Sequence, residues 1–425
     1  MSVSIPTVQV GTNNQTKVIV PTLLTAIGPS GSPIAVRADS TGQILSSPTG
    51  GGGGGTNALT FTIDTSNNLA AFSFTDIPDS FKDYDNYISR LSIGASVNSI
   101  GAYAFRSSSL TGRLIIPNSV TSIGSSAFAY TGISGELNIP SSVVSIGDYA
   151  FAGCYTLTGP LTIPSSVLYL NGGSFRDCQS LTSLTLSDSL TTIYPYTFSN
   201  CTGFTGKLTL PNSIVSIGDY AFQNCYGFTG PLTIPSSVIS IGYYAFSGCP
   251  GFTGPLSLSN VTYIGNAAFS GGLGFTGSLT LSNALIALGN YAFQGCLGFT
   301  GSLTLPNALT FIADYAFQGC SGFTGRLFIP NLVTSIGDYA FSGCSNLSEL
   351  TIPNSVTTIT TGAFAYCSSL KTVNCYTIAS VFGTTVFAAS GVTTIHARSS
   401  DSTWTAGPNQ TIGGKTGITV IKDLI

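Results

Sequence analysis

Apolar and polar positions alternate in short runs that recur along most of this chain. In residues 232–234 a leucine and an isoleucine flank Thr233, which predicts a strand with the two apolar side chains inward and the threonine outward. Pro235 cannot donate to a strand ladder and is expected to end this strand. Gly242 indicates a bend where a side chain would collide or φ is positive. The short segment 242–248 is predicted to form one helical or 3₁₀ turn.

One phenylalanine recurs within this pattern at spacings of 23 or 24 residues. Such a period is typical of stacked coils that share a core with their neighbours. The sequence therefore predicts a solenoid of about 13 coils of 23–24 residues. The recurring residues are Phe105, Phe128, Phe151, Phe175, Phe198, Phe222, Phe246, Phe269, Phe293, Phe317, Phe341, Phe364 and Phe387. The interior of one coil is expected to contain Leu232, Ile234, Val238, Ile241, Phe246 and Cys249.

The two coil lengths differ by one residue that comes with a Thr-Gly pair. Leu350 stands six residues after Cys344, whereas Leu232 stands seven residues after Cys225. We expect the extra residue to form a loop or bulge at the start of the strand and to leave the register of the core intact.

The repeat motif resembles the BspA-like class of leucine-rich repeats. The order Cys-x-x-Leu-x-x-Leu-x-Ile-Pro-x-Ser-Val-x-x-Ile-Gly-x-x-Ala-Phe is fitted closely by residues 346–367, and the resemblance covers residues 97–395. It implies a curved α/β leucine-rich-repeat solenoid with parallel strands lining a concave face. In that family the activity is attachment, by surface adhesins of bacteria and protists and by proteins of large viruses and phages. The family supplies no catalytic residues and no cofactor.

The segments outside the repeats predict terminal caps and an N-terminal extension. Residues 59–63 and 71–74 alternate as the strands of a hairpin would, with two asparagines between them. Caps are needed because the end coils would otherwise expose their cores to water. Trp404 is expected to plug the C-terminal end. The predicted division is an extended attachment arm (1–49), a glycine-rich linker (50–56), an N-terminal cap (57–96), the repeats (97–395) and a C-terminal cap (396–425).

The N-terminal arm contains extended runs but no core of its own. Residues 33–45, with their Val-Arg-x-Asp-x-x-Gly order, resemble the short attachment arms of phage head and tail fibre proteins. Residues 1–49 lack a basic start followed by an apolar stretch of signal-peptide length, so we expect assembly into a particle. The arm is predicted to anchor to a virion capsid or tail protein by strand addition. Its anchoring residues are Val8, Val10, Val18, Val20, Ile34, Val36 and Arg37.

Charge is scarce, with 13 basic and 16 acidic residues and a formal net charge of −3. The basic residues are scattered and form no patch, which argues against a nucleic-acid partner. No segment approaches the ~20 apolar residues that span a bilayer, so we expect no membrane insertion. A surface built from Ser, Thr, Asn, Gly and Tyr suits a host glycan or protein instead.

Nine cysteines lie three residues after a repeat phenylalanine and so form a column. Neighbours in such a column are about 4.8 Å apart, which does not exclude disulfides by length. Stacked side chains point the same way, however, and free cysteine packs well, so we expect buried thiols, with their oxidation state left open. With no Cys-x-x-Cys pair or nearby histidine, no metal site is predicted. The column is Cys154, Cys178, Cys201, Cys225, Cys249, Cys296, Cys320, Cys344 and Cys367.

The sequence offers almost no material for catalysis, and we expect a non-enzymatic protein. His396 is the only histidine and pairs with no predicted nucleophile. A column of aspartates three residues before the phenylalanine (Asp148, Asp219, Asp314 and Asp338) is interpreted as a solvated face. The one dense charge group, Asp76, Asp79, Lys82, Asp83 and Asp85, is predicted to be a solvated cap or turn; calcium binding there stays open.

The outward strand positions form the candidate binding surface. They are Thr162, Thr185, Thr209, Thr233, Ser257, Thr280, Thr304, Phe328 and Thr351. The preferred hypothesis is a phage or other virion fibre or surface decoration protein that presents this surface to a host. The alternative is a cell-surface adhesin of a bacterium or microbial eukaryote. Ice binding is a minor alternative, because Phe328 interrupts the threonine row. A homo-oligomer stays open, since no coiled-coil heptad enforces one.

Overall fold

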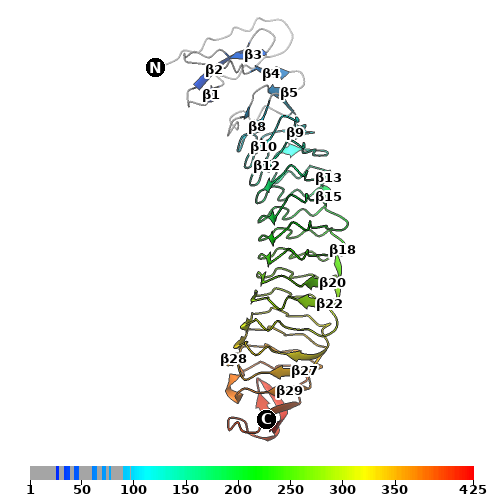
Figure 1. Ribbon diagram of the computed structural model, residues 1–425, viewed down its shortest axis with the longest axis vertical. Coiled ribbons are helices and arrows are strands. Elements are labelled where there is room, and N and C mark those ends of the chain that lie inside the picture. Colours follow the sequence, from blue (N-terminus) through cyan, green and yellow to red (C-terminus); the bar gives the residue numbers. More distant parts are fainter. Residues whose placement is uncertain are drawn as a thin grey trace, which may run out of the picture.

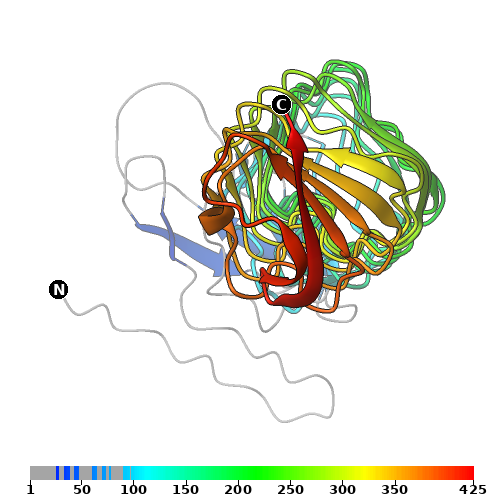
Figure 2. The same ribbon diagram turned by 90° about the horizontal axis from the view of Figure 1, so that it is seen from below.

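The chain folds as a long stack of coils. A computed structural model describes residues 25–27, 33–38, 43–46, 60–64, 69–72, 76–77, 90–95 and 97–425. The stack runs from the N-terminal strands to the C-terminal hairpin (Figure 1). Viewed from below, successive coils lie over one another around a common interior (Figure 2). The predicted leucine-rich-repeat solenoid is confirmed, and each coil covers the open side of its neighbour.

Parallel strands join the coils along two faces of the stack. The leucine-threonine segments supply the first set: β9 (Thr111–Gly112), β11 (Gly132–Ile133), β13 (Gly159–Thr162), β15 (Leu181–Thr185), β18 (Gly230–Pro231), β20 (Phe252–Leu258), β22 (Phe275–Leu281), β25 (Gly325–Phe328), β27 (Leu347–Ile352), β29 (Thr372–Cys375), β30 (Thr394–Arg398) and β32 (Lys415–Leu424).

A second set of two-residue strands precedes the glycine bend and was not predicted. It comprises β6 (Asp76–Ile77), β8 (Ser99–Ile100), β10 (Ser122–Ile123), β12 (Ser145–Ile146), β14 (Tyr169–Leu170), β16 (Thr192–Ile193), β17 (Ser216–Ile217), β19 (Ser240–Ile241), β21 (Tyr263–Ile264), β23 (Ala287–Leu288), β24 (Phe311–Ile312), β26 (Ser335–Ile336) and β28 (Thr358–Ile359). They form three parallel ladders, β6 to β14, β16 to β23 and β24 to β28, in which each strand pairs with the equivalent strand of the next coil, as β17 does with β19.

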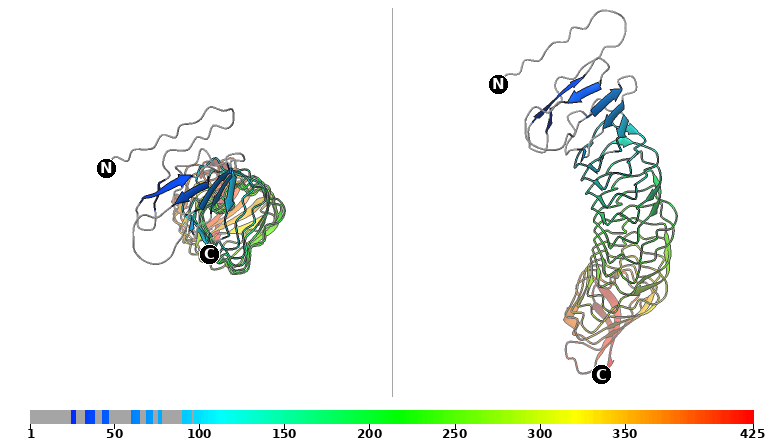
Figure 3. Two further views of the ribbon diagram at one scale, coloured as in Figure 1. Left: turned by 90° about the horizontal axis from the view of Figure 1, so that it is seen from above. Right: turned by 45° about the horizontal axis from the view of Figure 1, so that its top comes forward.

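The N-terminal strands form one six-stranded sheet at the end of the stack (Figure 3). Its order is β1 (Thr25–Ile27), β2 (Pro33–Ala38), β3 (Gln43–Ser46), β4 (Thr60–Asp64), β5 (Leu69–Phe72) and β7 (Arg90–Ile93). β4 and β5 pair antiparallel, which confirms the predicted hairpin. β3, from the predicted arm, pairs antiparallel with β4 of the predicted cap. This pairing connects the two segments across the glycine-rich stretch.

Several predictions for the N-terminal segment concern residues that the structure does not describe. Ile34, Val36 and Arg37 lie in β2. The other predicted anchoring residues, Val8, Val10, Val18 and Val20, lie outside the described residues, as do the linker at 50–56 and Asp79, Lys82, Asp83 and Asp85. Anchoring by the arm and calcium binding by the acidic group therefore remain predictions.

The predicted inside and outside of a coil are confirmed. Leu232 is buried, Ile234 packs against the core, and Thr233 is exposed. Phe246 is 1% exposed and stacks on Phe222 and Phe269, with ring centroids 5.4 and 5.5 Å apart. All thirteen repeat phenylalanines are buried in this way. Because each ring contacts the coil before and the coil after, the core is continuous along the stack.

The predicted helical turn after the glycine bend is wrong, so the fold is a β-solenoid rather than α/β. Among described residues, the helical segment is η2, three residues of 3₁₀ helix at Ala379–Val381. In the segment 242–248, Tyr244 has φ 54°, which a right-handed helix cannot accommodate. The N–H groups of Tyr244 and Phe246 donate to carbonyls of the next coil, at 2.8 Å each. Bonding between coils thus replaces bonding along a helix.

The bend and the bulge both follow from glycine. A side chain at Gly242 would place its Cβ 2.6 Å from the backbone nitrogen of Asp219 in the preceding coil, so collision is the reason for this glycine. The Thr-Gly extension behaves as predicted: the register of β13 against β15 shifts between Gly159 and Pro160 and then continues in step. Gly159 has φ +81°, which L-residues rarely adopt.

The cysteine column is buried and bonded between coils. Cys249 donates its Sγ–H to the carbonyl of Phe222 at 3.1 Å, and all nine column cysteines make the equivalent bond. Every cysteine, Cys375 included, is a free thiol. Burial raises the pKa of the Cys249 thiol to about 12. The prediction of buried thiols is confirmed.

The aspartate column is more than the solvated face that its spacing indicated. Asp219 Oδ1 accepts the backbone N–H of Tyr243 in the next coil at 2.8 Å. Asp148, Asp314 and Asp338 make the equivalent bond. Asn266 and Asn290 stand in the same column and accept in the same way. A side-chain acceptor at this position therefore joins neighbouring coils, and its charge is not required.

The C-terminal end is closed by a tryptophan and a hairpin. Trp404 is 4% exposed, packs edge-on against Phe382, and donates its indole N–H to the carbonyl of Thr377 at 2.9 Å. β31 (Gly407–Ile412) pairs antiparallel with β32, which itself pairs in parallel with β30. The role of Trp404 as a plug is confirmed.

Candidate binding groove

The described residues contain no assembled catalytic or metal site. No group of three or more His, Cys, Asp or Glu residues among them is placed to hold a metal ion. His396 lies in β30 and its Nδ1 contacts Asp423 Oδ2 at 2.8 Å, without a nucleophile in that contact. Within the same residues, no helix reaches the length and apolar character that a membrane crossing requires.

The predicted outward column does lie on the surface. Eight of its nine members, from Thr162 to Phe328, are exposed, and Thr351 is half-buried. They do not form one site, because they are spread over nine successive coils. Only Thr304, Phe328 and Thr351 line a common depression. That the column binds a ligand remains a prediction.

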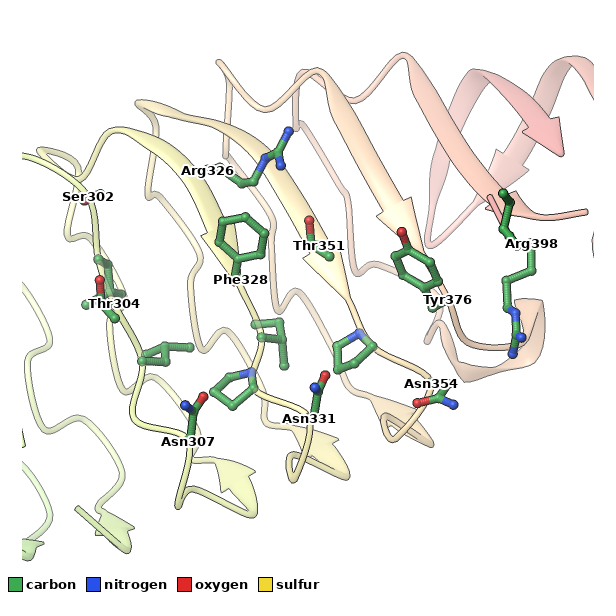
Figure 4. A pocket seen from close by; sticks show the side chains of 16 residues that line it. Ser302, Thr304, Asn307, Arg326, Phe328, Asn331, Thr351, Asn354, Tyr376 and Arg398 are labelled. Atoms are coloured by element: carbon green, nitrogen blue, oxygen red, sulfur yellow. The ribbon is translucent and has the colours of Figure 1, made fainter. Parts of the chain in front are cut away.

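This depression, the C-terminal groove, lies across β25, β27, β29 and β30 and has a volume of about 640 Å³. Figure 4 shows Phe328, Thr351 and Tyr376 on successive coils, with a row of three asparagines along one rim and Arg398 at the end nearest the C-terminus. Its labelled lining residues are Ser302, Thr304, Asn307, Arg326, Phe328, Asn331, Thr351, Asn354, Tyr376 and Arg398.

The groove lies where exposed positions depart from the repeat motif. Phe328 occupies a column position that holds threonine or serine in the other eight members of the column, while Asn374 and His396 take the aligned position in the two coils after Thr351. Ile352 aligns with Cys375, and Cys375 aligns with Ala397. The motif proline, Pro353, directly follows Ile352, so Tyr376 and Arg398 occupy the proline position in the next two coils. Since an apolar ring, a phenol and a guanidinium replace small side chains within four successive coils, this part of the face differs chemically from the rest.

The two arginines of the groove are in different electrostatic states. Arg326 pairs with Glu349, with Nη2 and Oε1 2.5 Å apart, and its guanidinium lies 5.2 Å from the centre of the Phe328 ring. Arg398 makes no ion pair within the described residues, and its buried Nε has no hydrogen-bond partner there. The charge of Arg326 is therefore neutralised by Glu349, and the guanidinium of Arg398 keeps hydrogen-bond donors without a partner.

Two acidic groups lie near the Arg398 end of the groove. Asp401 accepts hydrogen bonds from the Thr403 hydroxyl and N–H, which lower the pKa of Asp401; the charges of Lys422 and Arg398 lower it further. Asp423 contacts His396. Both carboxylates thus have other partners, and neither lines the groove.

Most of the groove lining was not predicted from the sequence. The outward column included Thr304, Phe328 and Thr351, but Arg326, Tyr376, Arg398 and the three asparagines were not proposed as site residues. A usable signal existed, because exposed residues that break a regular motif are not required by the stacking. In the sequence, Phe328 is identified both as a member of the outward column and as an interruption of its threonine row.

Comparison with known proteins shows which family the chain belongs to. A model of the BspA type leucine-rich repeat region (6 copies) matches residues 75–205, 159–276, 204–300 and 263–394. A leucine-rich repeat protein from Bacteroides ovatus is 25% identical, with TM-score 0.51, over 74% of this chain and 92% of that one. A leucine rich cell surface protein from Faecalibacterium prausnitzii is 22% identical, with TM-score 0.43, over 77% and 95%. No curated protein matches. Because the family model matches well over half of its length, the chain belongs to the BspA-type leucine-rich repeat family.

Proposed function

We propose that this chain is a non-enzymatic attachment protein that acts on the outside of a virion, as a phage fibre or surface decoration protein. The solenoid would present its polar strand face, with the C-terminal groove, to a host glycan or protein. The observation that carries this proposal is the groove itself: aromatic and guanidinium groups replace the small residues of the repeat at one accessible place, beside a row of exposed amides. Binding without chemistry suits a site that has donors and ring faces but no nucleophile.

The N-terminal segment supports the particle-bound form of the proposal. Six consecutive glycines at 50–55 separate it from the cap in sequence. β1 lies at one edge of the six-stranded sheet that contains β2 and β3, and pairing at a sheet edge is a common means of docking to a partner. A bacterial cell-surface adhesin is the second candidate, because the solved solenoid of matching fold from Bacteroides ovatus is a bacterial protein.

Mass spectrometry of purified virions and of washed host-cell envelopes separates the two candidates. Peptides from residues 97–425 in intact virions, in constant ratio to a capsid protein, are the expected result. Recovery in cell envelopes from cultures that carry no virus would favour the adhesin. Absence from both fractions, with recovery in the soluble cell interior, would contradict surface attachment altogether.

A further inference from the structure

We propose that the C-terminal groove binds a saccharide that bears a carboxylate. Neighbouring sugar rings contact Phe328 and Tyr376, and the carboxylate contacts Arg398. This inference rests on the proposed attachment function and specifies the ligand class of the same surface. It requires a groove of suitable size, ring faces, polar groups with free hydrogen-bonding capacity, and one unpaired cation, each of which the described residues supply.

The size and openness of the groove suit a few sugar units. Ligand sites typically have volumes of roughly 300–1,000 Å³, and this groove has about 640 Å³. It extends across the ends of four neighbouring strands rather than into the core, which is closely packed with phenylalanine. An extended ligand can therefore lie across the coils without disturbing the stack.

The aromatic side chains provide apolar contact surface within a polar row. Phe328 is 55% exposed although its column neighbours are hydroxyl residues. The guanidinium of Arg326, itself held by Glu349, lies over the ring. Tyr376 adds a second ring two coils further on (Figure 4). Ring faces carry partial negative charge and favour contact with the C–H side of a sugar, whose hydroxyls point elsewhere.

The asparagine rim supplies hydrogen bonds for those hydroxyls. Asn307, Asn331 and Asn354 are exposed at the equivalent position of three successive coils. None of their side chains bonds to another group in the described part of the chain, so each offers two donors and an acceptor. A sugar hydroxyl both donates and accepts, and it matches an amide better than a purely basic or purely acidic surface would.

The charge of the groove selects an acidic ligand over a neutral one. Arg326 is neutralised by Glu349, whereas Arg398 has no ion pair in the described residues, either with a side chain or with the main-chain carboxylate of Ile425, which lines the same end of the groove; no acidic side chain lines it. A planar guanidinium can hold a carboxylate with two parallel hydrogen bonds. The net charge of the chain is −3, so attraction at this point is local and comes from Arg398 rather than from the overall field.

Isothermal titration calorimetry on the full chain tests the assignment. Two acidic probes, sialyllactose and trigalacturonate, distinguish a terminal sialic acid from a uronic acid chain, and lactose is the neutral counterpart. We expect one acidic probe or both to bind and lactose to bind at least about tenfold more weakly, since a charge-assisted contact is lost. Equal binding of lactose and the acidic probes, or binding of no probe, would overturn the proposal.

Variants assign the binding to the groove. Arg398→Gln should weaken acidic-probe binding at least about tenfold, and Arg398→Lys should recover part of the loss. Phe328→Thr, which restores the usual column residue, should weaken it as well. Lys207→Gln is the matched control, because Lys207 occupies the position of Arg326 in a coil outside the groove and is exposed. Unchanged melting temperatures verify that the variants are folded.

Two further outcomes would reject the assignment. If Arg398→Gln and Lys207→Gln bind the acidic probes as the unaltered chain does, the sugar site lies elsewhere. If hexaglutamate binds more tightly than either sugar, the groove recognises an acidic peptide. Neither outcome touches the attachment function, which fails only if the chain is missing from virions and cell envelopes.

Discussion

Replacing Phe246 by alanine tests the interior of the stack directly. The ring is 1% exposed, stacks on Phe222 and Phe269, and contacts the edge of Phe252 with centroids 6.1 Å apart. Truncation of a buried phenylalanine costs about 3–5 kcal/mol, more when the surroundings cannot collapse into the cavity. Hydrogen bonds to the next coil, such as Phe246 N–H to Ala268 O at 2.8 Å, hold the backbone in place. We therefore expect a loss near the upper end, about 4–5 kcal/mol.

Urea unfolding followed by circular dichroism measures this loss, and hydrogen exchange locates it. Because each coil contacts only its neighbours, exchange should increase most in the coils that adjoin Phe246. Thr233→Ala is the matched control in the same coil; its side chain is exposed, so the cost should stay within about 0.5 kcal/mol. Equal losses for the two variants would refute the assignment of inside and outside.

Three further predictions concern the cysteine column, the aspartate column and the N-terminal segment. Burial raises the pKa of the Cys249 thiol from 9.0 to about 12, so this thiol loses its proton at lower pH in the unfolded chain than in the folded one. The free energy of unfolding should therefore fall as the pH rises from 9 to 12, and a value independent of pH across this window would contradict the prediction. Asp219→Ala should cost about 1 kcal/mol, because the hydrogen bond that Asp219 accepts from the Tyr243 N–H is lost. Asp219→Asn should cost little, because Asn266 accepts the equivalent bond from Asn290 in a later coil. Equal losses for the two variants in thermal melts would show that the charge matters. Deleting residues 1–55 should leave a folded repeat domain, as judged by circular dichroism, that no longer joins its particle; normal incorporation would make the arm dispensable.

The repeat architecture could be predicted because its causes are local. Alternation around Thr233 and the recurrence of Phe246 identify the strand and the core, and a cysteine three residues later must share that interior. The turn conformation could not be obtained this way. Tyr244 takes a left-handed φ because its N–H bonds to the next coil, and no propensity of a single coil contains that partner.

The groove was harder to predict because it exists only between coils. Phe328, Tyr376 and Arg398 are separated by tens of residues and meet only through the register of β25, β27, β29 and β30. Even with the coils aligned, the neutralised state of Arg326 depends on the cross-strand position of Glu349. Departures from the repeat motif are visible in the sequence, but their common location requires the structure.

Immunogold electron microscopy with an antibody against residues 97–425 tests the proposed attachment role most directly. Applied without permeabilisation to purified virions and to intact cells, it reports only chains that face outward. We expect gold on the outside of virions, and loss of that label when residues 1–55 are deleted. Label confined to the interior of sectioned cells, with none on any virion or cell surface, would contradict the role.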